Sequence, residues 1–198
     1  MSLFAAAPLQ LIEDAEGGIV CWPQWLPEAL ATEWFEALHA GAHWAHQRRP
    51  MYDRIVDVPR LLAAYDTDAL PTTLPLAAML ERVQATAPAP YNAIGLNLYR
   101  DGRDSVAMHN DKLHSIVPGQ PIALVSLGAP RRMRIRAKHA SGPGPGPGVG
   151  VELAPGSLLV MSHASQRSHE HGIAKTARAV GPRISAVFRV RPRHWRPD

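Results

Sequence analysis

Disulfides and membrane spans are the first features that this sequence lacks. Its 198 residues contain one cysteine, Cys21, so no disulfide can form within the chain, and a reducing compartment, the cytoplasm, is expected. No apolar run approaches the ~20 residues that cross a bilayer. The apolar N-terminal stretch has no basic start and leads directly into Glu13, Asp14 and Glu16, unlike a secretion signal. We therefore expect no membrane association.

Strong charge of one sign is also missing. Charged residues make up 19% and hydrophobic residues 46%, which excludes a disordered chain. Lys and Arg number 21 against 17 Asp and Glu, and the formal net charge of +4 permits a polyanionic partner without requiring one. The 19 prolines and 15 glycines disfavour a helical bundle and favour many short elements. The length suits a single domain over residues 1–198, which we expect to be a monomer.

Helical periodicity is confined to the first half of the chain. Residues 27–39 and 75–87 each carry apolar side chains at helical spacing, with a proline suited to the first turn. Between these predicted helices, residues 46–65 are rich in arginine and turn residues. Connections of this length are uncommon unless they serve a function, although an ordinary surface connection is the simpler interpretation.

The second half changes to short β-compatible runs separated by glycine and proline. They cover residues 91–99, 121–127, 131–137, 157–161 and 183–191, with no helix-length pattern between them. Residues 141–150, SGPGPGPGVG, are predicted to be a loop. Consecutive strands without crossover helices imply antiparallel pairing. The sequence therefore predicts a mainly β (α+β) protein with N-terminal helices and a sandwich, jelly-roll or barrel core.

The chemistry-bearing pattern is His109-Asn110-Asp111, with further histidines far along the chain. Residues i and i+2 of a strand project to one side, so His109 and Asp111 can converge on one point. A third histidine would complete the two-histidine, one-carboxylate ligand set of non-haem Fe(II) oxygenases. Spacing alone does not choose among His163, His169 and His171, and the same ligands would suit catalytic zinc.

Polar residues at even spacing accompany this pattern. Asn97 and Tyr99 share one face of their predicted strand, and Arg183 and Arg189 share one face of the last strand. The alternate residues of the last strand are apolar and must be buried: Ile184, Ala186, Phe188 and Val190. Either the two arginines lie in water, or their face is covered by an anionic ligand that arginine forks bind through paired hydrogen bonds.

Taken in order, these segments resemble the AlkB family of Fe(II)/2-oxoglutarate-dependent dioxygenases. The resemblance runs from about Tyr91 to Arg191 through the motifs NLYRDGRDSVAMHND, PGQPIALVSLGAPRRMRIR, GSLLVMSHASQRSHEHGIAK and GPRISAVFR. A weaker match, RIVDVPRLLAAYD, extends into the 46–65 region. The resemblance implies a double-stranded β-helix (jelly-roll) core over about 91–198. Residues 1–90 would supply the N-terminal helices and a nucleotide-recognition lid.

The resemblance also implies a ligand set and a co-substrate site. Fe(II) would be bound by His109, Asp111 and His171, the last chosen because it directly precedes the family's Gly-Ile-Ala-Lys segment. With O2 as the second co-substrate, 2-oxoglutarate would be held by Arg183, by Asn97, Tyr99 and Arg189, and by Ser185 in a position where the family usually has asparagine.

The implied reaction is oxidative demethylation of N-methylated bases in DNA or RNA, releasing formaldehyde, which is direct-reversal alkylation repair. The base would have to be flipped out or already single-stranded. The lid, residues 46–65, would grip the strand. Its Arg54 and Arg60 would contact phosphates, Tyr52 would fill the gap left by the base, and Tyr65 would stack on it. His109 would form one wall of the base pocket.

Three other functions remain open from the sequence. Lys112, Leu113 and His114 follow the HxD motif where repair enzymes of the family carry acidic residues, which favours a 2-oxoglutarate oxygenase acting on a protein, lipid or small molecule. A non-enzymatic nucleic-acid-binding β-domain with a structural metal is the second alternative. A zinc hydrolase is the third.

Overall fold

A computed structural model describes residues 7–51, 54–138 and 148–193, without the side chains of residues 49–55. Its strands form a seven-stranded major sheet, a four-stranded minor sheet and a two-stranded hairpin. The major sheet has the order β1-β2-β11-β8-β13-β6-β5, and every neighbouring pair is antiparallel. Its strands are β1 (Leu9–Ile12), β2 (Ile19–Trp22), β5 (Leu61–Asp66), β6 (Ala93–Tyr99), β8 (Ile122–Gly128), β11 (Ser157–Met161) and β13 (Arg183–Arg189).

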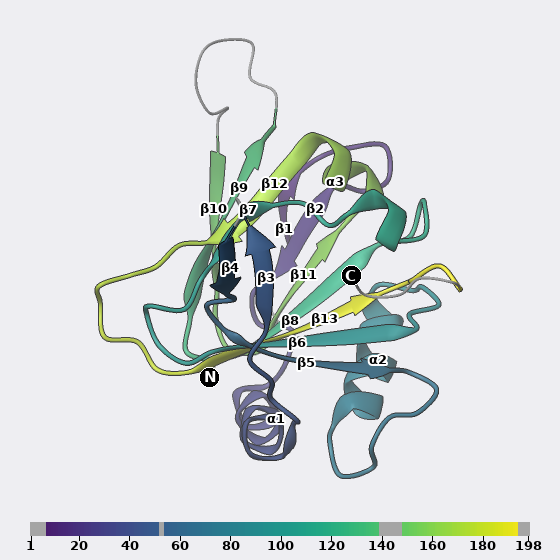
Figure 1. The fold of residues 1–198 in the computed structure, drawn as a ribbon. Helices are drawn as coiled ribbons and strands as arrows, with labels where there is room; N and C mark the ends of the chain where they lie inside the picture. The colour runs from purple at the N-terminus through teal and green to yellow at the C-terminus, as the bar shows by residue number, and fades with distance from the viewer. Residues whose placement is uncertain (1–6, 52–53, 139–147, 194–198) are drawn as a thin grey trace.

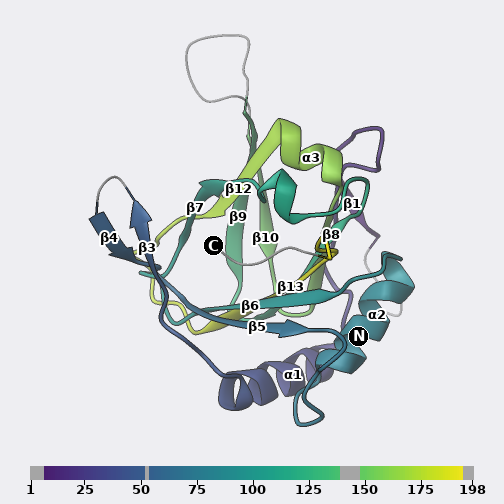
Figure 2. The ribbon, with the colours of Figure 1, turned by 45° about the vertical axis from the view of Figure 1, so that its right-hand side comes forward.

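The minor sheet packs against one part of the major sheet, and the hairpin forms a separate two-stranded sheet. The minor sheet has the order β10-β9-β12-β7, again antiparallel. Its strands are β7 (Val106–His109), β9 (Arg131–Ala137), β10 (Gly148–Leu153) and β12 (His169–Ile173). The hairpin consists of β3 (Arg48–Met51) and β4 (Arg54–Asp57) and stands next to β7 (Figures 1 and 2).

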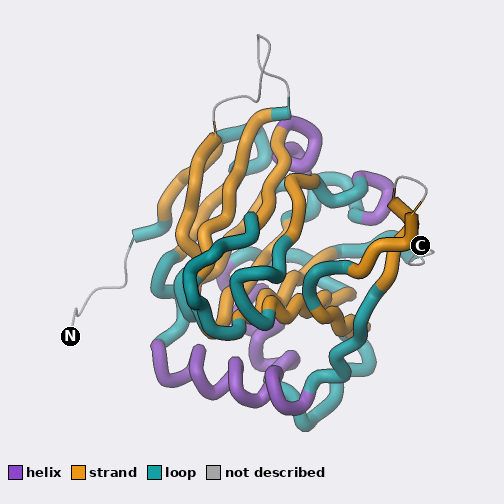
Figure 3. Tube along the Cα trace, turned by 60° about the vertical axis from the view of Figure 1, so that its left-hand side comes forward, coloured by secondary structure: helices purple, strands orange, loops and turns teal. Residues whose placement is uncertain are grey.

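Two helices cover the face of the major sheet that is turned away from the minor sheet. They are α1 (Glu28–Gly41), which packs on β8 and β13, and α2 (Leu76–Thr86). In Figure 3 the longest helix lies along the bottom of the molecule, below the strands. Helical spacing places Ala31, Trp34 and Leu38 of α1 on one buried face. These residues join a hydrophobic cluster with the sheet side chains that face the helices, including Phe188.

A second hydrophobic cluster fills the space between the two sheets. Leu124 and Val187 of the major sheet meet Met133, Ile135 and Ile173 of the minor sheet there. Two antiparallel sheets that enclose a core, with the chain crossing between them, make up the expected jelly roll. The 3-10 helix Leu113–Ser115 and the helix α3 (His163–Ser168) lie at the same end of this core.

The sequence predicted the two longer helices and five of the strands, but not the remaining elements. Both helices, the five predicted strands and their antiparallel pairing are confirmed. The loop prediction for residues 141–150 is wrong at its end, because β10 begins at Gly148, and the rest of that segment lies outside the described residues. The 46–65 connection is likewise not all surface loop, because β5 pairs with β6 and extends the major sheet. Among the described residues, no helix has the length and apolarity needed to cross a membrane.

Candidate active site

The strand β13 contributes side chains to both sides of the major sheet. Ile184, Ala186 and Phe188 enter the cluster under the helices, whereas the alternate side chains face the interior between the sheets. Register places Arg183 opposite Tyr99 and Ser185 opposite Asn97. Both faces of this strand are buried, so the alternative that both arginines lie in water is wrong, whereas the anionic ligand stays a prediction. Two strands therefore bring these four polar side chains to one interior surface.

Arg183 is a buried cation with unused hydrogen-bonding capacity. It is 0% exposed, its Nε donates to the Ser126 hydroxyl at 3.0 Å, and its guanidinium lies 5.1 Å from the centre of the Tyr99 ring. Both Nη atoms are buried without a hydrogen-bond partner among the described atoms. Burial, with a smaller contribution from the Arg131 charge, lowers the pKa of Arg183 to about 10, so the side chain stays charged at neutral pH.

The contrast with Arg131 indicates what is missing at Arg183. Arg131 is also buried, but it donates to the carbonyl oxygens of Asp101, Asp104 and Ala174 at 3.1, 3.0 and 2.7 Å. An unsatisfied buried cation is costly, and a carboxylate that accepts from both Nη atoms is the ligand that an arginine fork fits best. The two Nη atoms of Arg183 therefore fit a carboxylate group.

The two histidines of the expected metal site meet across the minor sheet. His109 of β7 pairs with His171 of β12, and the ring centres are 4.6 Å apart. The register shifts between this pair and the pair formed by Val106 and Ile173, so β7 carries a bulge that turns both Val106 and His109 inward. His171 is thus the late histidine that meets His109, whereas His169 contacts the Ser168 hydroxyl at 2.8 Å. The role of His171 as a metal ligand stays a prediction.

Both imidazoles are prepared to act as neutral nitrogen ligands. His109 Nδ1 lies 2.8 Å from the carbonyl oxygen of Ala107, which can only accept, so Nδ1 carries the proton and Nε2 keeps its lone pair. Burial lowers the pKa of His109. Burial and the neighbouring His109 also lower the pKa of His171, to about 3. Neither ring has to lose a proton at neutral pH before it can bind a metal.

Asp111 lies beside these rings and is paired with Arg189. Arg189 Nε and Nη2 donate to Oδ2 and Oδ1 at 2.7 and 3.1 Å. Burial alone would raise the pKa of Asp111, but the charge and hydrogen bonds of Arg189 lower it to about 2. The backbone N–H of Asp111 donates to the buried side chain of Gln166 at 3.0 Å. Gln166 lies on α3, so this short helix holds the loop that carries the carboxylate.

The donor set matches that of a non-haem Fe(II) site, although the ligands are not fully closed. Within the described ranges, no three His, Cys, Asp or Glu side chains are close enough to hold a metal as they stand. Both oxygens of Asp111 instead accept hydrogen bonds from Arg189. The residue types and the neutral rings fit Fe(II).

Two of the expected substrate-binding residues, Arg60 and Tyr65, make other contacts in the structure. Arg60 is not a free phosphate contact, because its Nε donates to the Asn97 side chain at 2.8 Å and its Nη1 to the Ser105 carbonyl at 3.2 Å. Tyr65 was expected to stack on the base, which is wrong. It packs with the cluster under the helices, on the sheet face opposite Asn97, and its hydroxyl accepts from the His43 N–H. Tyr52 and the Arg54 side chain lie outside the described residues.

Sequence reasoning missed two residues that organise the site, Ser126 and Gln166, and expected a different contact for a third, Arg60. Ser126 positions Arg183, Gln166 positions the Asp111 backbone, and Arg60 links the 46–65 region to Asn97. Ser126 belongs to the Ser-Leu-Gly segment, so the motif was visible but its contact was not. The N-cap of α3 was the available signal for Gln166, since Ser162 accepts from the Ser165 N–H at 2.9 Å.

Comparison with known proteins defines the class. Residues 18–191 match the family model of the 2OG-Fe(II) oxygenase superfamily. Human DNA oxidative demethylase ALKBH2 is 30% identical over 180 residues, covering 82% of this chain and 69% of that protein. Mouse alpha-ketoglutarate-dependent dioxygenase alkB homolog 3 is 27% identical over 211 residues, covering 93% of this chain and 74% of that protein.

Solved structures support the same fold. OsALKBH1 superposes with a TM-score of 0.61 at 14% identity, covering 87% of this chain and 96% of that one. A Pseudomonas putida prolyl-4-hydroxylase superposes with a TM-score of 0.55 at 16% identity, covering 88% and 94%. The family model and these relatives identify the protein as a 2-oxoglutarate-dependent dioxygenase, which uses Fe(II) with 2-oxoglutarate and O2 as co-substrates. Within that class, the chain belongs to the AlkB family.

Proposed function

We propose that this protein removes N-linked methyl groups from bases in nucleic acid, with methylated DNA as the main substrate. The observation that carries the proposal is its 30% identity, over 82% of the chain, to the human DNA oxidative demethylase ALKBH2. The net charge of +4 is compatible with a polyanionic substrate. We further propose that it acts as a monomer in the cytoplasm, in line with its single, buried cysteine.

In this proposal each interior side chain has one task. His109 and His171 supply neutral nitrogen ligands for Fe(II), and Asp111 supplies the carboxylate. Arg183, held by Ser126 and beside Tyr99, would donate from its two unpartnered Nη atoms to the distal carboxylate of 2-oxoglutarate. When bound, the iron couples decarboxylation of 2-oxoglutarate to hydroxylation of a C–H bond.

Other side chains orient these groups and exclude water. Arg189 restrains Asp111 and offers positive charge beside the metal site, and Asn97 is fixed from the other side by Arg60. Ser185 is buried against Asn97 in the register of the sheet. Hydroxylation of an N-linked methyl carbon gives a hemiaminal, whose C–N bond then breaks to release formaldehyde and the free base. The protein therefore needs to direct only the oxidation step.

Product analysis tests the proposal directly. An oligonucleotide carrying 1-methyladenine or 3-methylcytosine, incubated with Fe(II), ascorbate and 2-oxoglutarate, should yield formaldehyde and succinate in equal amounts. The His109→Ala variant should yield neither, and an unmethylated oligonucleotide should yield no formaldehyde. Succinate formed without formaldehyde from either lesion would contradict a demethylase of these bases.

A second substrate class is favoured by one feature of the site's rim. Lys112, Leu113 and His114 are all exposed next to Asp111, and Leu113 is 39% exposed. A basic and apolar rim suits a protein, lipid or small molecule as well as a nucleic acid. In that case the decarboxylation of 2-oxoglutarate would not be stimulated by any methylated oligonucleotide.

A further inference from the structure

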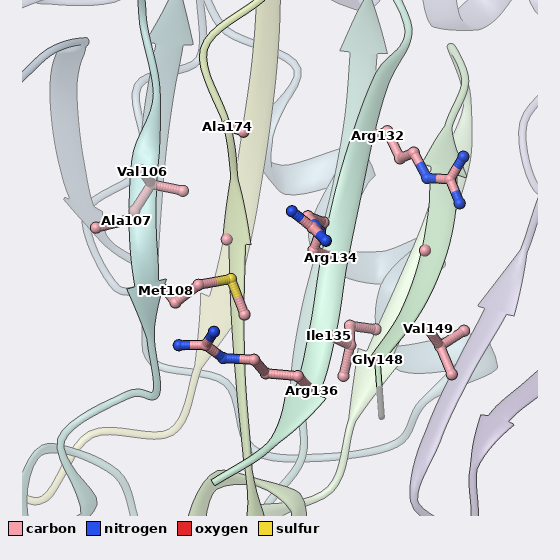
Figure 4. A pocket seen from close by; sticks show the side chains of 12 residues that line it. Val106, Ala107, Met108, Arg132, Arg134, Ile135, Arg136, Gly148, Val149 and Ala174 are labelled. Carbon is pink, nitrogen blue, oxygen red and sulfur yellow. The ribbon is translucent and has the colours of Figure 1, made fainter. Parts of the chain in front are cut away.

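The outer face of the minor sheet carries a basic groove that the proposed active site does not use. Arg132, Arg134 and Arg136 alternate along β9 and point away from the interior, which receives Met133 and Ile135. The groove has a volume of ≈ 540 Å³ and crosses all four strands of the sheet. Figure 4 shows the three guanidiniums over these strands. We call it the arginine groove.

Glycines form the floor of the arginine groove. Register places Arg134 between Gly150 of β10 and Gly172 of β12. A Cβ atom at Gly150 would lie 2.4 Å from Nε of Arg132, which therefore occupies the space above that glycine. A Cβ atom at Gly172 would lie 2.9 Å from the Val106 carbonyl oxygen. On one side of Arg134, Gly150 thus makes room for the Arg132 side chain, and on the other side Gly172 allows the backbone of β7 to approach closely.

The charges of the arginine groove are only partly balanced by the protein. Arg136 is paired with Glu170, with its Nε 2.5 Å from Oε1. Glu152 stands opposite Arg132 in the register, but neither Arg132 nor Arg134 forms an ion pair with any residue of the described ranges. Both side chains are exposed, so their guanidiniums are open to an anion from solution.

The shape of the groove favours a polymer over a small anion. It is open along the strands, and its cations repeat at every second residue, with Cα atoms about 6.8 Å apart. That is about twice the ~3.4 Å axial spacing of phosphates along one nucleic-acid strand. Arginine forks bind phosphate through paired hydrogen bonds. The side chain of Met108, next to His109, reaches the same groove at the edge strand β7.

We propose that the arginine groove binds the phosphodiester backbone of the nucleic-acid strand on which the enzyme acts, at a distance from the target base. This inference rests on the proposed function. His109 and His171 face the interior from the same strands that form the groove, so the two sites lie on opposite faces of one sheet. A strand that passes around the edge at β7 would contact both, whereas a short oligonucleotide would reach only one.

Binding of unmodified nucleic acid, without iron, tests the groove independently of turnover. Fluorescence anisotropy would compare 5-nucleotide and 30-nucleotide single strands, as DNA and as RNA, over a range of salt. Removing two phosphate contacts in the double variant Arg132→Ala/Arg134→Ala should weaken binding of the 30-mers at least tenfold. The slope of log affinity against log salt should fall by about 1.4, because each contact to a single strand contributes about 0.7.

The control is Arg82→Ala, which removes an exposed arginine from α2 and should change the slope little. Arg134→Lys, which keeps the charge, should retain most of the slope. Equal affinity of the double variant and the wild type for the 30-mers at every salt concentration would contradict the proposal that the arginine groove binds nucleic acid. Failure of the proposed function would look different: no formaldehyde from methylated oligonucleotides, whatever the binding results.

Discussion

At the residue scale, the Arg183 side chain affects both the stability of the protein and its affinity for a carboxylate. A guanidinium buried between two sheets, with two nitrogen atoms unsatisfied, destabilises the protein as long as no anion is bound. The same charge becomes favourable when a carboxylate arrives. Stability and ligand affinity should therefore respond in opposite directions to its removal.

We expect Arg183→Met to leave the ligand-free protein as stable as the wild type or more stable, by about 1–3 kcal/mol, because a buried unpaired charge is replaced by an apolar chain. Binding of 2-oxoglutarate at 100 times its dissociation constant should stabilise the wild type by about 2.7 kcal/mol. The variant should show no such gain. Denaturant unfolding with and without 2-oxoglutarate measures both quantities.

Arg183→Lys is the matched control, since it keeps the charge and loses the fork, and its response to 2-oxoglutarate should be reduced rather than abolished. A ligand-free Arg183→Met protein that is several kcal/mol less stable than the wild type would contradict this account. It would mean that the contacts to Ser126 and Tyr99 outweigh the burial of the charge.

At the scale of elements, Gly128 fixes the position of α1 on the major sheet. It ends β8 with φ of +77°, and a Cβ atom there would lie 2.5 Å from the Pro182 carbonyl oxygen and 2.6 Å from the Phe35 ring of α1. Glycine is required both by the left-handed backbone and by the close approach of the helix. This accounts for the glycine of the Ser-Leu-Gly segment.

We expect Gly128→Ala to destabilise the protein by more than about 3 kcal/mol, the sum of backbone strain and a steric clash. Gly119→Ala is the control. Its φ is +74° and nothing lies within 4 Å of the added atom, so only the strain of about 1 kcal/mol applies. Chemical denaturation of the two variants separates the contributions, and equal losses would argue against a tight contact between α1 and β8.

Elements also mark the boundary of what the sequence could predict. The helices and the long strands have clear periodicity, whereas the roles assigned to Arg183, His109 and His171 stay predictions. Shorter strands in both halves were missed, because runs of four or five residues such as β2, β7 and β12 carry too little pattern. The contact between Arg60 and Asn97 depends on how the 46–65 region packs on the core, which no local pattern encodes.

At the scale of the whole molecule, the buried histidines couple stability to pH. The pKa of His171 is about 3 in the folded protein, against 6.5 for an exposed histidine, since burial and neighbouring charges disfavour its protonation. A group whose pKa is lowered by folding contributes stability that is fully present above pH 6.5 and is lost as the pH falls toward 3.

We therefore expect the metal-free protein to lose about 2 kcal/mol of unfolding free energy between pH 8 and pH 5 through His171 alone. In His171→Asn this part of the loss should disappear. The exposed His114→Asn is the control and should follow the wild type. Urea unfolding at pH 8, 6.5 and 5 supplies the comparison, and parallel pH profiles for wild type and His171→Asn would refute the prediction.

The position of β13 has a consequence for biosynthesis. It follows every other strand along the chain, yet it lies inside the major sheet, between β8 and β6. Until β13 emerges from the ribosome, the facing edges of β8 and β6 are unpaired, and the nascent polypeptide lacks both Arg183 and Arg189. Insertion of β13 completes the sheet and adds both arginines in one event, so a chain that stops short of this strand lacks both the completed core and these two side chains.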